Sequence, residues 1–327
     1  MRQTSSLFAG TASLSRQPTS HQLFSDLINR ALAHKPVSYG LVWPCEDHAL
    51  TGPLEAAQKG IIQPVLIGDE ARMHAIAREH RIDLSSYQII PAETPEIAAQ
   101  KAVDLARTGQ VQGLMKGSLH TDTLMHAVVA PANGLCTGRR ISHVFLLAVP
   151  GYKKLLFVTD AAINIFPDLS TKRDIVQNAI DLHIGLGLGQ PRVAILSAVE
   201  VINPKIPSTL DAASLCKMAE RGQITGGMLD GPLGMDNAID PEAARIKNLT
   251  SPVAGHAQIL VTPDLEAGNM LAKNLIFMAQ ADSAGIALGA RVPIVLTSRA
   301  DSVQARLASA AIGALYARHL AQQDAAF

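Results

Sequence analysis

Short apolar runs alternate with longer amphipathic stretches along the chain from about Thr19 onward. This alternation is typical of repeated βαβ units, in which helices cover the faces of a parallel sheet. We predict strands at residues 38–42, 64–67, 88–90, 113–115, 143–149, 155–159, 192–198, 226–229, 258–261, 284–288 and 293–296. Helical stretches such as residues 54–59 and 70–80 fill the gaps, and a last helix is predicted at residues 301–319. The predicted fold class is α/β, with two α/β/α domains and mostly parallel sheets.

The length of 327 residues favours two domains, because a single compact core rarely grows to that size. The apolar pattern breaks near Pro150-Gly151, a pair typical of turns. We expect residues 1–145 together with 291–327 to form the first α/β domain, and residues 146–290 to form the second. Two domains imply a cleft between them, and we expect the active site in that cleft.

Composition excludes several classes of partner. Lys plus Arg equals Asp plus Glu, at 28 each, so no net field attracts a nucleic acid or an anionic membrane. Charged residues are only 17%, below the roughly 25% of an average soluble domain, so we expect surface to be buried in a homodimer. The three cysteines fit neither a disulfide scaffold nor a zinc site, and no apolar run approaches the roughly 18 residues that span a bilayer. These features predict a cytoplasmic protein with no membrane partner.

Small and polar residues break the apolar pattern in four loops that follow predicted strands, at residues 116–121, 160–164, 230–234 and 297–301. Ligands of parallel sheets bind at such places, because free backbone N–H groups of helix N-termini favour anions. In the first loop, Lys116, Ser118 and Thr121 supply a cation and two hydroxyls that suit a phosphate oxygen, although the spaced glycines of an ATP-binding loop are missing. Alternatively, Ser118 or Thr121 caps the following helix, predicted at residues 122–129.

Arginines near two other strands are candidates for binding phosphate. Arg139-Arg140 precedes the strand that closes the first half of the chain, and Arg299 follows the last strand. Arginines from different loops can together hold the nonbridging oxygens of a phosphate group, whereas a surface ion pair would give the same spacing. Ser298 and Asp301 flank Arg299, and Asp301 either caps the last helix or accepts a proton during catalysis.

Two further motifs are interpreted as structural. The glycines of residues 185–189 end a helical stretch and precede a strand, which is the reverse of a dinucleotide-binding fingerprint. Asp122 and His126 share one helix face, and we interpret them as a solvated pair rather than as metal ligands. The sequence therefore predicts neither a nicotinamide site nor a metal site.

Read together, the segments resemble the phosphate acetyltransferase and phosphate butyryltransferase family. The resemblance runs from about Leu54 to Leu320, and its clearest segments are residues 54–57, 64–68, 115–123, 160–164, 263–269 and 296–302. It implies two α/β domains like those of isocitrate dehydrogenase, an active site in the cleft, a dimer, and neither a metal nor a nicotinamide. Coenzyme A is then a substrate, together with inorganic phosphate or acyl phosphate, and no cofactor is bound.

The resemblance also implies a direct transfer, in which the coenzyme A thiolate attacks the carbonyl carbon of the acyl phosphate. Ser298 matches the serine that stabilises the transition state, Arg299 the adjacent arginine, and Arg140 another phosphate-binding arginine. Asp160 and Asn164, in a segment shared with the family, are further candidates for substrate binding. The acetyl branch has a catalytic aspartate where this chain has Ala305, so Asp301 is the nearest carboxylate and the identity of the base stays open. Residues 296–302 are closer to the butyryl branch.

Two other functions fit the same sequence. A dehydrogenase can share this type of fold, because fold alone does not determine chemistry. A non-catalytic protein that binds acyl phosphate or coenzyme A would explain the missing aspartate. The acyltransferase interpretation requires Ser298 and Arg299 to share a pocket with the loop near Ser118.

Overall fold

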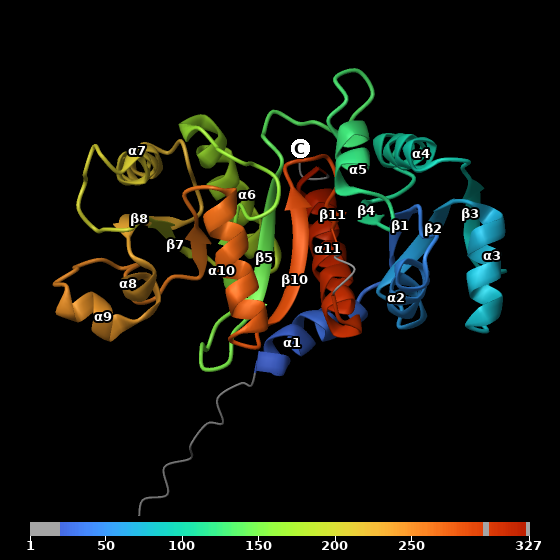
Figure 1. Ribbon diagram of the computed structural model, residues 1–327, viewed down its shortest axis with the longest axis horizontal. Helices are drawn as coiled ribbons and strands as arrows, with labels where there is room; N and C mark the ends of the chain where they lie inside the picture. The colour runs from blue at the N-terminus through green and yellow to red at the C-terminus, as the bar shows by residue number, and fades with distance from the viewer. Residues whose placement is uncertain (1–19, 297–300, 325–327) are drawn as a thin grey trace, which may run out of the picture.

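The computed structural model describes residues 20–296 and 301–324. Their strands form a single eleven-stranded sheet in the order β3-β2-β1-β4-β11-β10-β5-β6-β9-β7-β8 (Figure 1). The strands are β1 (Val37–Val42), β2 (Ile62–Gly68), β3 (Gln88–Pro91), β4 (Gly113–Lys116), β5 (Ser142–Ala148), β6 (Leu156–Thr159), β7 (Arg192–Leu196), β8 (Met228–Leu233), β9 (Ile259–Val261), β10 (Asp282–Leu288) and β11 (Ile294–Val295). All eleven predicted strands are therefore present.

The helices of the described residues separate most of these strands in sequence. They are α1 (Ser20–Leu32), α2 (Asp47–Gln58), α3 (Glu70–Glu79), α4 (Pro95–Arg107), α5 (Thr121–Val128), α6 (Leu169–Gly185), α7 (Pro207–Glu220), α8 (Met235–Ile239), α9 (Pro241–Ile246), α10 (Leu265–Phe277) and α11 (Val303–Asp324). Their starts follow local rules: Thr94 caps α4, where its Oγ1 accepts a hydrogen bond from the Ile97 N–H at 3.3 Å, and Asp168 caps α6 in the same way. The glycines of residues 185–189 end α6, which confirms the interpretation of that motif as a helix stop.

The sheet joins two parallel flanks through antiparallel strands. β3, β2, β1, β4 and β11 run parallel, as do β6, β9, β7 and β8, whereas β10 and β5 pair antiparallel with their neighbours. The predicted α/β class is confirmed, but the two expected sheets form one continuous sheet, because β5 and β10 hydrogen bond to each other and to both flanks. The division at residues 145/146 and 290/291 stays a prediction.

Among the strands, the largest boundary difference is at β8, which was predicted at residues 226–229 and is observed at Met228–Leu233. It continues through Pro232, a residue without a backbone N–H. β8 is the last strand of the sheet order, and an edge strand tolerates proline because one of its sides needs no hydrogen-bond donors.

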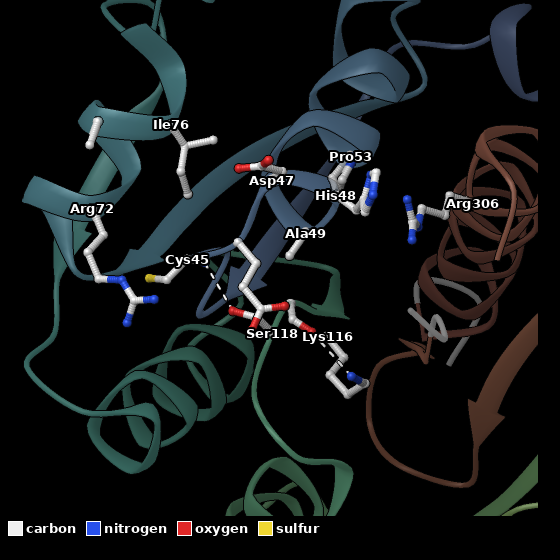
Figure 2. A pocket seen from close by; sticks show the side chains of 13 residues that line it. Cys45, Asp47, His48, Ala49, Pro53, Arg72, Ile76, Lys116, Ser118 and Arg306 are labelled. Carbon is white, nitrogen blue, oxygen red and sulfur yellow. Dashed lines mark hydrogen bonds between the residues drawn. The ribbon is translucent and has the colours of Figure 1, made fainter. Parts of the chain in front are cut away.

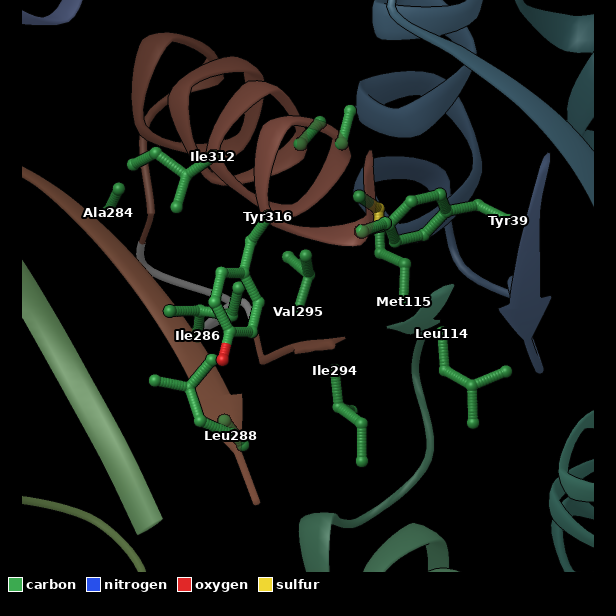
Figure 3. Packing of buried hydrophobic residues seen from close by; sticks show 14 of the residues in the cluster. Tyr39, Leu114, Met115, Ala284, Ile286, Leu288, Ile294, Val295, Ile312 and Tyr316 are labelled. Carbon is green, nitrogen blue, oxygen red and sulfur yellow. The ribbon is translucent and has the colours of Figure 1, made fainter. Parts of the chain in front are cut away.

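Helix α11 packs against the half of the sheet that contains β1, β4, β11 and β10. Its residues 305–317 are all buried, and it packs on α1, α2 and β10. Tyr316 of α11 lies beside Ile286 and Leu288 of β10, and Ile312 lies near Ala284 (Figure 3). Because α11 is apolar on nearly every side, a charged residue within this segment stands out.

None of the described helices is long and apolar enough to cross a membrane.

Because His143 is buried, we expect the free energy of unfolding to fall as the pH is lowered. This residue of β5 is 2% exposed, and burial, with a smaller contribution from Lys273, lowers its pKa to about 3. The unfolded chain binds this proton near pH 6.5 and the folded chain does not, so the free energy of unfolding falls by up to about 1.4 kcal/mol per pH unit below pH 6.5. We expect His143→Leu to make the free energy of unfolding depend less steeply on pH between pH 6.5 and 4.5, by about one proton bound on unfolding. Urea unfolding at several pH values measures this slope. An unchanged slope would refute this role.

Candidate active site

A pocket of about 560 Å³ opens at the carboxyl ends of β1 and β4 (Figure 2). Val42 of β1 pairs with Lys116 of β4 in parallel register, so both segments leave the sheet at the same edge. We call this cavity the β1–β4 pocket. Its described lining comes from the loop after β1, α2, α3, the loop after β4 and α11: Cys45, Glu46, Asp47, His48, Ala49, Pro53, Arg72, Ala75, Ile76, Lys116, Gly117, Ser118 and Arg306.

Hydrogen bonds fix the loop after β4 against the end of β1. The Gly117 N–H donates to the Val42 carbonyl at 2.8 Å, and the Ser118 N–H donates to the Trp43 carbonyl at 2.9 Å. The Ser118 hydroxyl donates to the same Trp43 carbonyl at 2.8 Å and accepts from the Cys45 N–H at 3.2 Å. Ser118 therefore holds the two loops together at the floor of the pocket.

Cationic side chains enter the β1–β4 pocket from three elements. Arg72 lies in the first turn of α3, which Asp69 caps by accepting the Arg72 N–H at 3.0 Å. The Lys116 ammonium donates to the carbonyls of Gly117 and Leu119, both at 3.2 Å, and so closes its own loop. Arg306 reaches the pocket from α11 (Figure 2). This distribution of positive charge suits an anionic ligand.

Cys45 also lines the pocket, but it is not a candidate nucleophile. Its side chain is 2% exposed, and burial raises the pKa of its thiol. A protonated thiol is unreactive because the thiolate is the nucleophilic form. The pocket is thus arranged to bind a ligand rather than to form a covalent intermediate on this cysteine.

Comparison with known proteins identifies the family. Residues 93–314 match the family described as phosphate acetyl/butaryl transferase. The chain is 62% identical over 312 residues to phosphate acetyltransferase of Rhizobium meliloti, covering 95% of this chain and 99% of that protein. The chain belongs to the phosphate acetyl/butyryl transferase family. This confirms the resemblance seen in the sequence.

Other relatives of the phosphate acetyl/butyryl transferase family support this assignment. Phosphate butyryltransferase of Clostridium beijerinckii is 40% identical over 295 residues, which is 90% of this chain and 97% of that protein. A branched-chain phosphotransacylase from Enterococcus faecalis V583 superposes with a TM-score of 0.76 at 30% identity, covering 86% of this chain and 99% of that one. A putative 4-hydroxythreonine-4-phosphate dehydrogenase from Salmonella typhimurium, at TM-score 0.54 and 14% identity, covers 88% of this chain and 99% of that one and shares the fold alone. The dehydrogenase alternative is not favoured.

The predicted loop at residues 116–121 contributes to the β1–β4 pocket in part. Lys116 and Ser118 line it, whereas Thr121 begins α5 and is not among its described lining residues. The alternative interpretation, in which Ser118 or Thr121 caps α5, is wrong. The helix begins after His120 without a side-chain cap, because the Ser118 hydroxyl bonds to the loop after β1 instead.

The chain leaves β11 for α11 beside the β1–β4 pocket. β11 runs parallel to β4, with Val295 beside Met115, so Leu296 leaves the sheet next to Lys116. Ser298 and Arg299 lie outside the described residues. Asp301 lines a different cavity of about 150 Å³, together with Lys273 of α10 and Asp282 of β10. We call this cavity the α10–α11 pocket.

The cap of α11 is Ser302, not Asp301. The Ser302 hydroxyl accepts a hydrogen bond from the Ala305 N–H at 3.1 Å, which is the geometry of a helix N-cap. The predicted capping role of Asp301 is therefore taken by its neighbour.

Arg140, Asp160 and Asn164 lie elsewhere in the fold. Three antiparallel pairings separate β4 from β6, so the two strands run in opposite directions and their carboxyl ends lie at opposite edges of the sheet. Arg140 precedes β5 at the edge where β6 ends, and its side chain is exposed. None of these three residues is among the described lining of the β1–β4 pocket.

Asp160 organises its own loop. Its buried carboxylate accepts from the N–H groups of Ala162, Ile163 and Asn164 at 3.0, 3.1 and 3.2 Å, and from Asn164 Nδ2 at 2.6 Å. Burial raises the pKa of Asp160, and these hydrogen bonds oppose that rise. Asn164 Nδ2 also donates to the Ile141 carbonyl at 2.9 Å, which ties the loop to the start of β5.

Sequence reasoning missed His48, Arg72 and Arg306. The first two follow predicted strands closely, and the rule that ligands bind beyond strand ends would have found them if it had been applied to the loops after β1 and β2. Arg306 lies inside a helix, and the search of loops that follow strands does not reach it.

Proposed function

We propose that this chain moves a short acyl group, acetyl or butyryl, between coenzyme A and inorganic phosphate in the β1–β4 pocket. The observation that carries the proposal is 62% identity to a phosphate acetyltransferase along 95% of the chain. The geometry supports it, because Lys116, Arg72 and Arg306 bring positive charge to one cavity at the carboxyl ends of parallel strands.

The proposed reaction is a direct transfer. The coenzyme A sulfur forms a bond to the carbonyl carbon of the acyl phosphate, the bond from that carbon to the phosphate oxygen breaks, and the electron pair leaves with phosphate. A thiol with a pKa of about 8.5 is already a few per cent thiolate at neutral pH, so a base need supply only part of the rate. Fixed cations would stabilise the charge that develops on the leaving phosphate.

We assign roles within this mechanism as follows. Ser298 and Arg299 act on the reacting group, and Lys116 and Ser118 shape the binding loop. Asp301 contributes little as a base, because it lines the α10–α11 pocket rather than the β1–β4 pocket. Asp160 and Asn164 fix the conformation of the loop after β6 through their hydrogen bonds. No resident cofactor is needed, since acyl-CoA, acyl phosphate and inorganic phosphate supply every reacting atom.

We also propose that the protein is a cytoplasmic homodimer. Apolar side chains are exposed along α10 and in the loop beside its start: Ile165, Phe166, Met270, Phe277 and Met278. The Leu265 N–H donates to the Ile165 carbonyl at 3.1 Å, which holds that loop against α10. Such a set is typical of a surface buried by a second subunit, and sedimentation equilibrium at the mass of one chain would refute the dimer.

Thioester formation tests the proposed function. The full chain is mixed with coenzyme A and either acetyl or butyryl phosphate, and thioester absorbance is followed. We expect turnover with both, and a preference set by the fit of the acyl chain, since one pocket methylene changes discrimination by about 1–3 kcal/mol. Absence of thioester with both substrates would exclude the transferase, and binding without turnover would favour the non-catalytic alternative.

A further inference from the structure

Arg306 is a buried charge in an apolar helix. It lies in the first turn of α11 and is 7% exposed, and the residues around it in that helix include Ala305, Leu307 and Ala308, all buried. Arginine is rarely buried to this extent unless its charge has a partner or a function, because removing the guanidinium from water is costly. The burial of Arg306 therefore indicates that its guanidinium has a polar partner, a function in the pocket, or both.

The neighbouring helix is adapted to this side chain. Gly52 lies inside α2, where glycine costs about 1 kcal/mol relative to alanine. A Cβ at Gly52 would lie 2.9 Å from Cδ of Arg306 and 3.6 Å from its Nη1. The absence of a side chain at Gly52 thus leaves room for the Arg306 stem against α2. From there Arg306 reaches the β1–β4 pocket (Figure 2).

The other cations of the pocket are placed differently. The Lys116 ammonium donates to two carbonyls of its own loop, and Arg72 is exposed at the opposite end of the pocket from Arg306 (Figure 2). Glu46 and Asp47 also line the cavity, at the exposed start of α2. A buried guanidinium acts in a medium of lower dielectric than an exposed one, so its attraction for a bound anion is stronger.

We propose that Arg306 binds the phosphate group of the substrate, as inorganic phosphate in one direction and as acyl phosphate in the other. This rests on the proposed function and adds a phosphate ligand beyond the arginines that the family resemblance implied. The planar guanidinium matches two phosphate oxygens at once, which an ammonium does not. Arg306 stays protonated throughout. The thiol proton ends on the released phosphate, whose oxygen keeps the electron pair of the broken bond.

The test compares two substitutions at this position with a control on the same helix. Steady-state rates are measured with the full chain in the phosphate-consuming direction, varying phosphate and acyl-CoA separately. We expect Arg306→Gln to raise KM for phosphate at least about tenfold, with KM for acyl-CoA changed less than about twofold. Arg306→Lys should raise KM for phosphate by a smaller factor, because charge remains without the paired geometry. Arg318→Gln, three turns along α11, should match the unchanged protein.

The outcomes separate this proposal from its rivals. If Arg306→Gln lowers the unfolding midpoint but leaves KM for phosphate within twofold, Arg306 is a structural partner of the pocket acids and the proposal is overturned. Should Arg306→Gln fail to fold, Arg306→Lys decides, and an unchanged KM for phosphate rejects the proposal. Failure of the proposed function looks different, because the unsubstituted chain would then form no thioester at all.

Discussion

Replacement of Arg299 by alanine is expected to lower kcat for thioester formation at least about a hundredfold, because loss of one preorganised donor to a developing charge costs about 2.7–4 kcal/mol. Asp301→Asn should have a far smaller effect, since Asp301 lines the α10–α11 pocket rather than the β1–β4 pocket. Initial rates at saturating acyl phosphate and coenzyme A measure both effects directly.

An exposed arginine provides the control for this experiment. Arg291 precedes β11 and is exposed, so Arg291→Ala should keep kcat within about twofold. Near-normal turnover in Arg299→Ala would remove Arg299 from the reaction. A larger loss in Asp301→Asn than in Arg299→Ala would instead assign the chemistry to the aspartate.

Gly117→Ala is expected to lower kcat/KM by about two orders of magnitude, because misplacing binding groups by about 1 Å can cost that much. A Cβ at Gly117 would lie 2.5 Å from the carbonyl oxygens of both Val42 and Trp43, which are backbone atoms and cannot rotate away. The loop would have to lift from β1 and lose the Ser118 N–H bond to Trp43.

Gly138→Ala is the matched control, since no atom lies within 4 Å of a Cβ at that exposed position. Circular dichroism establishes that both variants are folded. Full activity in a folded Gly117→Ala protein would show that the β1–β4 pocket is not where the acyl group is transferred.

The strands could be predicted well because each is a short buried run between turn residues. Residues 113–115, for example, were predicted as a strand and are observed within Gly113–Lys116. Sheet order and strand direction could not be predicted, since they depend on pairings between distant segments such as β5 with β10. That is why Arg140 and Lys116 were expected in one cleft, whereas they lie at opposite edges of the sheet.

Of the residues that line the β1–β4 pocket, the sequence predicted only those in the loop after β4. Lys116 and Ser118 were found because they follow a strand. The hydroxyl of Ser118 joins two loops rather than capping α5, and its role as a phosphate ligand stays a prediction. Arg306 could not be found, because its position in the pocket depends on the space that Gly52 leaves in another helix.

The burial of Cys45 has a consequence for an enzyme whose proposed substrate is itself a thiol. Thiol–disulfide exchange proceeds through attack by a thiolate, and burial raises the pKa of the Cys45 thiol and so disfavours its thiolate. Coenzyme A disulfide that enters the pocket under oxidising conditions would therefore meet no reactive sulfur there. A mixed disulfide between Cys45 and coenzyme A is therefore disfavoured.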